Sequence, residues 1–109
     1  MPDQPYFAWE QEPNENGQAD IKVIWQPNLE GKPGSHFFVK YRVKGENQWL
    51  MTDPVLYENH HTVHGLDPDT NYEFRVVSVD GEFQTESLSQ EVDTSGIGEY
   101  LVWKVPSRY

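Results

Sequence analysis

The sequence predicts an all-β fold, a seven-stranded antiparallel β-sandwich. Apolar and polar residues alternate over several short segments, which is the two-residue period of a half-buried strand. Gly, Pro, Asn and Asp gather between these segments, where turns are expected. No segment shows a clear helical period. Short alternating segments separated by regularly spaced turns are typical of antiparallel sandwiches.

The length favours one domain, because 109 residues suffice for one hydrophobic core. Hydrophobic residues make up 36% of the chain, and four Trp and six Tyr supply large apolar surfaces for burial. No interior linker, internal repeat or low-complexity tract divides the sequence. We therefore expect a single domain over residues 1–109, with its core at about 5–95 and a C-terminal tail or linker at 96–109.

Two strands are predicted in the N-terminal half. In the strand at 21–25, Ile21, Val23 and Trp25 share one face. A segment rich in Asn, Gly and Pro follows at 27–34. The second strand alternates apolar with mostly charged positions: Phe37, Val39, Tyr41 and Val43 against Phe38, Lys40, Arg42 and Lys44.

Further strands are predicted at 49–52, 60–64, 71–79 and 87–94. The residues at 44–47 contain a Gly and can reverse the chain, and Asp80-Gly81 is a strong hairpin signal. Pro54 and Pro68 lack a backbone N–H, so both belong in loops or at sheet edges. These turns predict antiparallel neighbours.

One segment carries a specific resemblance. Gly65-Leu66 is followed by Pro68, Thr70 and Tyr72, and this spacing resembles the fibronectin type III pattern. In the family these residues form a turn between two strands. The resemblance implies that Leu66 closes the bottom of the core there, and that the Tyr72 hydroxyl hydrogen-bonds the backbone a few residues upstream. Trp25 is similar to the family's core tryptophan and Tyr41 to a residue of its third strand. The resemblance implies a structural core that contains Trp25, Tyr41, Leu66 and Tyr72.

A narrower resemblance rests on residues 34–46, Trp49, Thr52-Asp53 and 72–81. The sequences of these segments are similar to those of the neuroglian and neurofascin family of neural cell adhesion molecules. The resemblance implies one domain of a single-pass receptor ectodomain, on the extracellular side of the plasma membrane. Contact with the membrane would come only through the parent receptor's transmembrane segment. Two stretches depart from the family: 6–10 is an atypical first strand, and 97–109 has no counterpart.

Charge narrows the class of partner. Eight Lys and Arg face 18 Asp and Glu, which gives a net charge of −10 and disfavours binding to nucleic acid or anionic lipid. The chain has no cysteine, so disulfides, thiol nucleophiles and thiolate metal sites are excluded. We expect protein partners, with no small-molecule substrate and no cofactor.

Candidate chemical groups do not form a convincing site. His60, His61 and His64 invite a metal interpretation. On a strand, however, His60 and His64 would lie about 13 Å apart with His61 on the opposite face, too far for one ion. The carboxylates are scattered, and no Gly-x-Ser-x-Gly elbow holds a nucleophile. We expect no enzymatic activity and no metal site.

Candidate contact residues fall in two places. Lys40, Arg42 and Lys44 form a cationic stripe along one outward strand face; pairing with neighbouring carboxylates and docking of a partner are both open interpretations. Tyr100 and Trp103 belong to a β-prone tail that could dock on its own domain or on a second copy. Four other aromatics have no obvious inward position: Phe38, Trp49, Tyr57 and Phe83. Among these we expect Trp49 to pack across a sheet edge.

The functional expectation is a non-catalytic module of a neural cell adhesion receptor, which supplies protein contacts, homophilic or lateral, and length to the ectodomain. The alternative is a domain of the same fold in a cytosolic or muscle scaffold protein. Neither an Arg-Gly-Asp tripeptide nor a Trp-Ser-x-Trp-Ser motif occurs, which disfavours integrin-binding and cytokine-receptor roles. No N-glycosylation sequon blocks either face.

Overall fold

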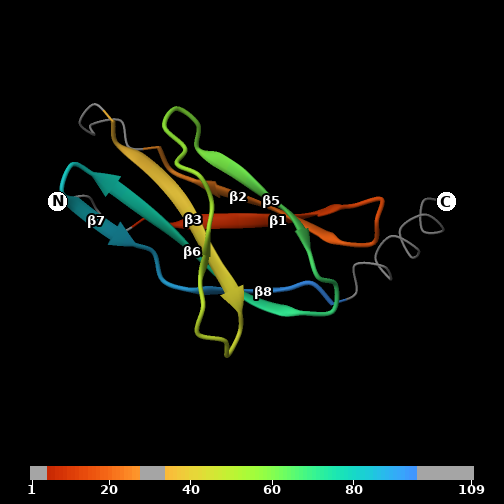
Figure 1. Ribbon diagram of the computed structural model, residues 1–109. Coiled ribbons are helices and arrows are strands. Elements are labelled where there is room, and N and C mark those ends of the chain that lie inside the picture. The colour runs from red at the N-terminus through yellow and green to blue at the C-terminus, as the bar shows by residue number, and fades with distance from the viewer. Residues whose placement is uncertain (1–4, 28–33, 96–109) are drawn as a thin grey trace.

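The computed structural model describes residues 5–27 and 34–95, and its regular elements there are all strands (Figure 1). They are β1 (Phe7–Pro13), β2 (Ala19–Trp25), β3 (His36–Val43), β4 (Leu50–Met51), β5 (His60–Leu66), β6 (Asn71–Asp80), β7 (Phe83–Glu86) and β8 (Gln90–Asp93). The all-β prediction is confirmed. The strands at 21–25 and 71–79 lie close to their predicted bounds, whereas 49–52 keeps only two residues as strand.

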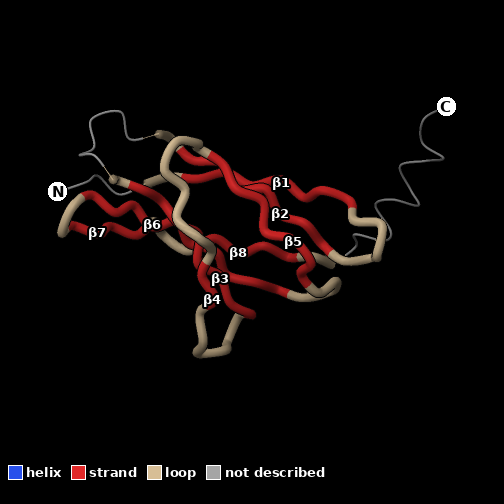
Figure 2. The backbone as a smooth tube through the Cα atoms, turned by 45° about the horizontal axis from the view of Figure 1, so that its top comes forward, coloured by secondary structure: helices blue, strands red, loops and turns tan. Residues whose placement is uncertain are grey.

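The strands form two antiparallel sheets. One has the order β1-β2-β5; in the other β4 pairs β3, β3 pairs β6, and β6 pairs both β7 and β8. Figures 1 and 2 show β1, β2 and β5 on one side of the molecule and β3, β6 and β8 on the other. The antiparallel sandwich that the alternation predicts is therefore confirmed.

The segments β7 and β8 are two halves of one interrupted strand. Val77 pairs with Glu86 and Phe74 with Gln90, so the outer strand has one residue more than β6 between these pairs. This extra residue makes a β-bulge. Ser87 bridges it, because its N–H donates to the Val76 carbonyl at 2.8 Å and its hydroxyl accepts the Val76 N–H at 2.9 Å. Counted in this way, the eight segments correspond to the seven predicted strands.

The first strand is longer than the sequence indicated. Pairing with β2 runs in unbroken register from Phe7↔Trp25 to Pro13↔Ala19. Pro13 lies on an outer strand of the sheet. The N–H that proline lacks is therefore not needed for a hydrogen bond to a further strand. The atypical segment 6–10 is thus largely an ordinary edge strand.

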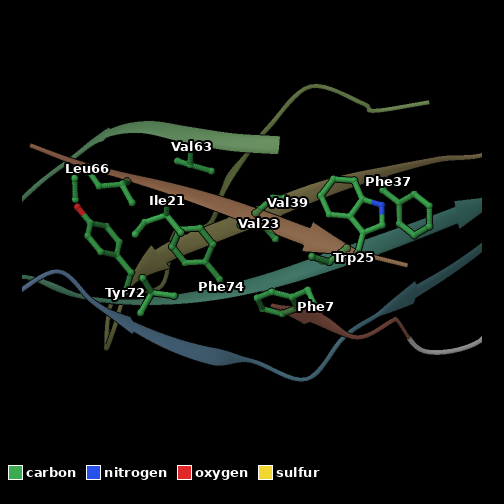
Figure 3. Close-up of a cluster of buried hydrophobic side chains, with 13 residues drawn as sticks. Phe7, Ile21, Val23, Trp25, Phe37, Val39, Val63, Leu66, Tyr72 and Phe74 are labelled. Carbon is green, nitrogen blue, oxygen red and sulfur yellow. The ribbon is translucent and has the colours of Figure 1, made fainter. Parts of the chain in front are cut away.

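The core lies between the sheets and is built by alternation. Along β2 every second residue from Ala19 to Trp25 is buried. Figure 3 shows Trp25 beside Phe37 at one end of the core and Tyr72 beside Leu66 at the other. The Trp25 and Phe37 ring centroids lie 5.4 Å apart. Trp25, Leu66 and Tyr72 are buried, whereas Tyr41 is only partly buried and stacks on Phe74 at the margin of the core.

Candidate protein-contact surface

The outward face of β3 and β6 carries most of the cations found in the part of the chain that the structure describes. Residues of β3 alternate between the core and this face, and the register sets Lys40 opposite Arg75 and Arg42 opposite Glu73. Lys44 follows directly after β3. Among the described residues, every cation except Lys22 belongs to this surface. We call it the β3–β6 face, defined by Lys40, Arg42, Lys44, Trp49, Glu73, Arg75, Glu86 and Glu91.

Each cation of the face has a carboxylate partner. Lys40 Nζ lies 2.8 Å from Glu86 Oε2, and Arg75 Nη1 lies 2.9 Å from Glu86 Oε1. Arg42 Nε lies 3.0 Å from Glu73 Oε1. Lys44 pairs with Glu91. The structure thus shows the pairing that was one of the two interpretations of the cationic stripe.

The face differs in charge from the rest of the domain. It carries four cations against three carboxylates, whereas the other described residues hold twelve carboxylates and the single cation Lys22. Like charges repel at close approach, so an acidic partner meets least repulsion here. Lys44 is the most exposed cation of the face, with 52% of its side-chain surface accessible against 17% for Lys40 and 25% for Arg42.

Trp49 covers the paired cations. Its ring centroid lies 4.3 Å from Arg42 Cζ, 4.8 Å from Lys40 Nζ and 5.7 Å from Arg75 Cζ. Trp49 directly precedes β4, and β4 pairs with β3 through Lys40↔Met51, which brings the indole over the sheet. Each such cation–π contact contributes about 0.5–1 kcal/mol at an exposed site. As expected from the sequence, Trp49 packs at a sheet edge.

Two groups of the face, Glu86 and Lys44, have pKa values shifted by their neighbours. Burial of Glu86 raises its pKa, but the hydrogen bonds and charges of Lys40 and Arg75 outweigh this effect and hold the pKa below 4.5. The hydrogen bond and charge of Glu91 raise the pKa of Lys44 above 10.5. Glu86 and Lys44 are therefore charged when a partner meets them at neutral pH.

Sequence reasoning left pairing of the stripe open without naming Glu86 or Glu91 as partners. The fold brings these two carboxylates against Lys40 and Lys44. The available signal was the short distance in sequence from the Asp80-Gly81 hairpin to Glu86, which places this carboxylate across from the strand that precedes the turn.

Other expected contact residues lie elsewhere. Tyr100 and Trp103 fall outside the described residues. Tyr57 precedes β5 and is 95% exposed, and Phe83 begins β7 and is 48% exposed. Neither of these two aromatics belongs to the β3–β6 face.

Two histidines of β5, His60 and His64, lie in the other sheet of the sandwich from the β3–β6 face, and each has a carboxylate neighbour. His60 Nε2 lies 3.2 Å from Glu58 Oε2, and His64 Nδ1 lies 2.9 Å from Asp20 Oδ2. Within one copy, over residues 5–27 and 34–95, no three His, Asp or Glu side chains gather to hold a metal ion. The same part of the chain holds no helix long and apolar enough to cross a membrane.

The sandwich fold, together with the hydrogen bond of 2.9 Å that the Tyr72 hydroxyl accepts from the Asp67 N–H, defines a class of protein. The family model described as fibronectin type III domain matches residues 12–95, so the chain belongs to that family. Over 96 residues, or 88% of its length, the chain is 51% identical to neuroglian of Drosophila melanogaster. The chain spans about 7% of the length of that relative.

Solved structures agree on the fold. The FN5 domain of Drosophila Lar superposes with a TM-score of 0.63 at 25% identity, covering 88% of this chain and 99% of that one. A myokine structure superposes with a TM-score of 0.70 at 14% identity, covering 87% of this chain and 99% of that one. At such low identity the second match shows the fold alone.

Proposed function

We propose that this chain is a non-catalytic extracellular module of a neural cell adhesion receptor, which contributes protein contacts and spaces neighbouring parts of the ectodomain. The observation that carries the proposal is the 51% identity to neuroglian over 88% of the chain. The fibronectin type III fold adds no chemistry of its own, and function in such folds resides in the surfaces they present. Adhesion through surface complementarity needs only a stable sandwich and an accessible face.

The β3–β6 face is the proposed contact surface. Its near balance of charge distinguishes it from the acidic remainder of the domain, and its indole offers apolar area beside polar groups, a combination enriched where binding energy concentrates. Lys44 is more exposed than Lys40 and Arg42, and it can exchange Glu91 for a carboxylate of another protein. Tyr100 and Trp103 remain proposed contacts of the tail.

Bead binding tests the proposal. Fluorescent beads that carry the chain at fixed density are applied to cultured Drosophila neurons, and bound beads are counted. Beads that carry a fibronectin type III domain of similar charge from an unrelated intracellular protein serve as the control. We expect binding several-fold above the control. Equal binding by the two kinds of beads would contradict an adhesive role for this domain.

A further inference from the structure

The strand β5 is an outer strand without charged residues or proline. Among the described residues it ends the sheet β1-β2-β5, and it contains no Asp, Glu, Lys, Arg or Pro. A bulge between Val63 and Leu66, where Gly65 has a φ of 73°, shifts its register against β2 near the end of the strand. Proteins normally protect edge strands with charges, prolines, bulges or short length. The other outer strands have such features: β1 contains Glu10, Glu12 and Pro13, β4 is two residues long, and a bulge interrupts β7 and β8. Before its own bulge, β5 is therefore open to pairing with another strand.

The backbone of β5 presents hydrogen-bonding groups to that open side. Trp25 N–H donates to the Asn59 carbonyl at 2.9 Å, so the alternation of a strand directs the groups of His61 and Val63 toward β2 and those of His60 and Thr62 away from it. Val63 is buried, so His60, Thr62 and His64 share the outer side-chain face.

A second copy of the chain fits this edge through two-fold symmetry. In an antiparallel pair centred on Thr62, Thr62 lies opposite Thr62 of the second copy, and His60 lies opposite His64 of the second copy, once on each side of the axis. Directly opposed residues have Cβ atoms about 5 Å apart. Within one copy the same two histidines are about 13 Å apart along the strand. Pairing thus brings together imidazoles that a single chain keeps separate.

His64 is already oriented as a metal ligand. Its Nδ1 lies 2.9 Å from Asp20 Oδ2, whereas its side chain is 72% exposed, which leaves Nε2 free to bind. Asp20 is fixed by hydrogen bonds from Asn14 Nδ2 and the Gly65 N–H, both 3.0 Å long, and its side chain is only 14% exposed. A carboxylate on the second ring nitrogen is the usual arrangement behind metal-bound histidine.

His60 brings a second donor with it. Its Nε2 lies 3.2 Å from Glu58 Oε2, and the Glu58 side chain is 65% exposed. Two imidazoles and one carboxylate form a donor set that suits zinc. Since each chain carries a net charge of −10, two copies repel one another, and two bound Zn²⁺ ions would reduce that repulsion at the interface.

We propose that the β5 edges of two copies pair antiparallel about Thr62, and that each opposed His60–His64 pair, together with Glu58, binds one zinc ion. This contact uses a different sheet from the β3–β6 face. It goes beyond the proposed adhesive function, and failure of either proposal leaves the other untouched.

Sedimentation velocity of the chain, free of any affinity tag, tests the pairing. We expect a monomer in EDTA and a dimer that binds two zinc ions when zinc chloride is added. His60→Ala and His64→Ala should each abolish zinc-dependent dimerisation, whereas His36→Ala on β3 should not. Thermal unfolding in EDTA checks that the variants fold. A wild-type chain that stays monomeric with zinc, or a dimer that survives both substitutions, would overturn the proposal.

Mixing the two variants tests the register itself. In a mixed dimer of His60→Ala with His64→Ala, one site loses both histidines and the other keeps both. We therefore expect an equimolar mixture to recover zinc-dependent dimers with one zinc ion per dimer, although neither variant dimerises alone. If the mixture stays monomeric while the wild type dimerises, the pairing of His60 with His64 across copies is wrong.

Discussion

The hydroxyl of Tyr72 accepts a hydrogen bond of 2.9 Å from the backbone N–H of Asp67, five residues upstream. Burial is the main cause that raises the pKa of Tyr72 above 10.0, so the hydroxyl stays protonated at neutral pH. Leu66, at the end of β5, is buried beside it at the bottom of the core. This bond ties the start of β6 to the turn that leads into it.

Removing that hydroxyl is expected to destabilise the domain by about 1 kcal/mol, the usual net value of one hydrogen bond. Urea denaturation of Tyr72→Phe measures the effect. Tyr57→Phe is the matched control, since Tyr57 is 95% exposed and should lose nothing measurable. Equal stability of the two variants would show that the corner bond contributes nothing.

Trp25→Ala is expected to cost about 3–5 kcal/mol in the free energy of unfolding, because it empties a large volume between the sheets. The indole is 3% exposed and packs on Phe37, and its Nε1 has no hydrogen-bond partner among residues 5–27 and 34–95, so the loss is one of packing. Trp49→Ala should cost markedly less, since Trp49 lies on the outer face. A similar loss for both variants would contradict this placement of the two tryptophans.

Local pattern predicted what is local in the fold. The alternation in β2, the hairpin at Asp80-Gly81 and the Tyr72 corner each involve residues close in sequence, so propensity and spacing suffice. The ion pairs of the face join positions up to 47 residues apart, such as Lys44 and Glu91, and depend on strand register. The bulge at Ser87 likewise depends on the partner strand, which no local signal specifies.

Low pH is expected to lower the stability of the folded domain, partly because Asp20 becomes protonated. Burial raises the pKa of Asp20, but hydrogen bonds from Asn14, Gly65 and His64 outweigh it and hold the pKa below 3.8. A carboxyl whose pKa is lower in the folded than in the unfolded state stabilises the folded state at pH values above its unfolded-state pKa. This contribution is lost as the pH falls through the folded-state pKa. We expect Asp20→Asn to be less stable than wild type at pH 6, with the difference shrinking below pH 3.8.

Thermal unfolding between pH 6 and pH 2 measures this dependence. Glu10→Gln, which removes an exposed carboxylate from β1, controls for the loss of one charge. A stability difference between wild type and Asp20→Asn that does not change with pH would contradict the role assigned to the Asp20 hydrogen bonds.

Trp49 and Arg42 should be energetically coupled. Their separation of 4.3 Å between ring centroid and Cζ predicts a coupling of about 0.5–1 kcal/mol. A double-mutant cycle with Trp49→Leu and Arg42→Met, followed by urea denaturation, isolates this energy from the Arg42 pair with Glu73. Additive single effects would show that the indole merely lies over the cation.

The location of the contact surface is tested most directly by reversing one charge on each sheet. Lys44→Glu alters the most exposed cation of the β3–β6 face, and Lys22→Glu makes the same change on β2. Both variants are displayed on beads and applied to neurons after thermal unfolding confirms that each folds. We predict several-fold weaker binding for Lys44→Glu and unchanged binding for Lys22→Glu. Equal binding by the two variants would contradict the assignment of the β3–β6 face.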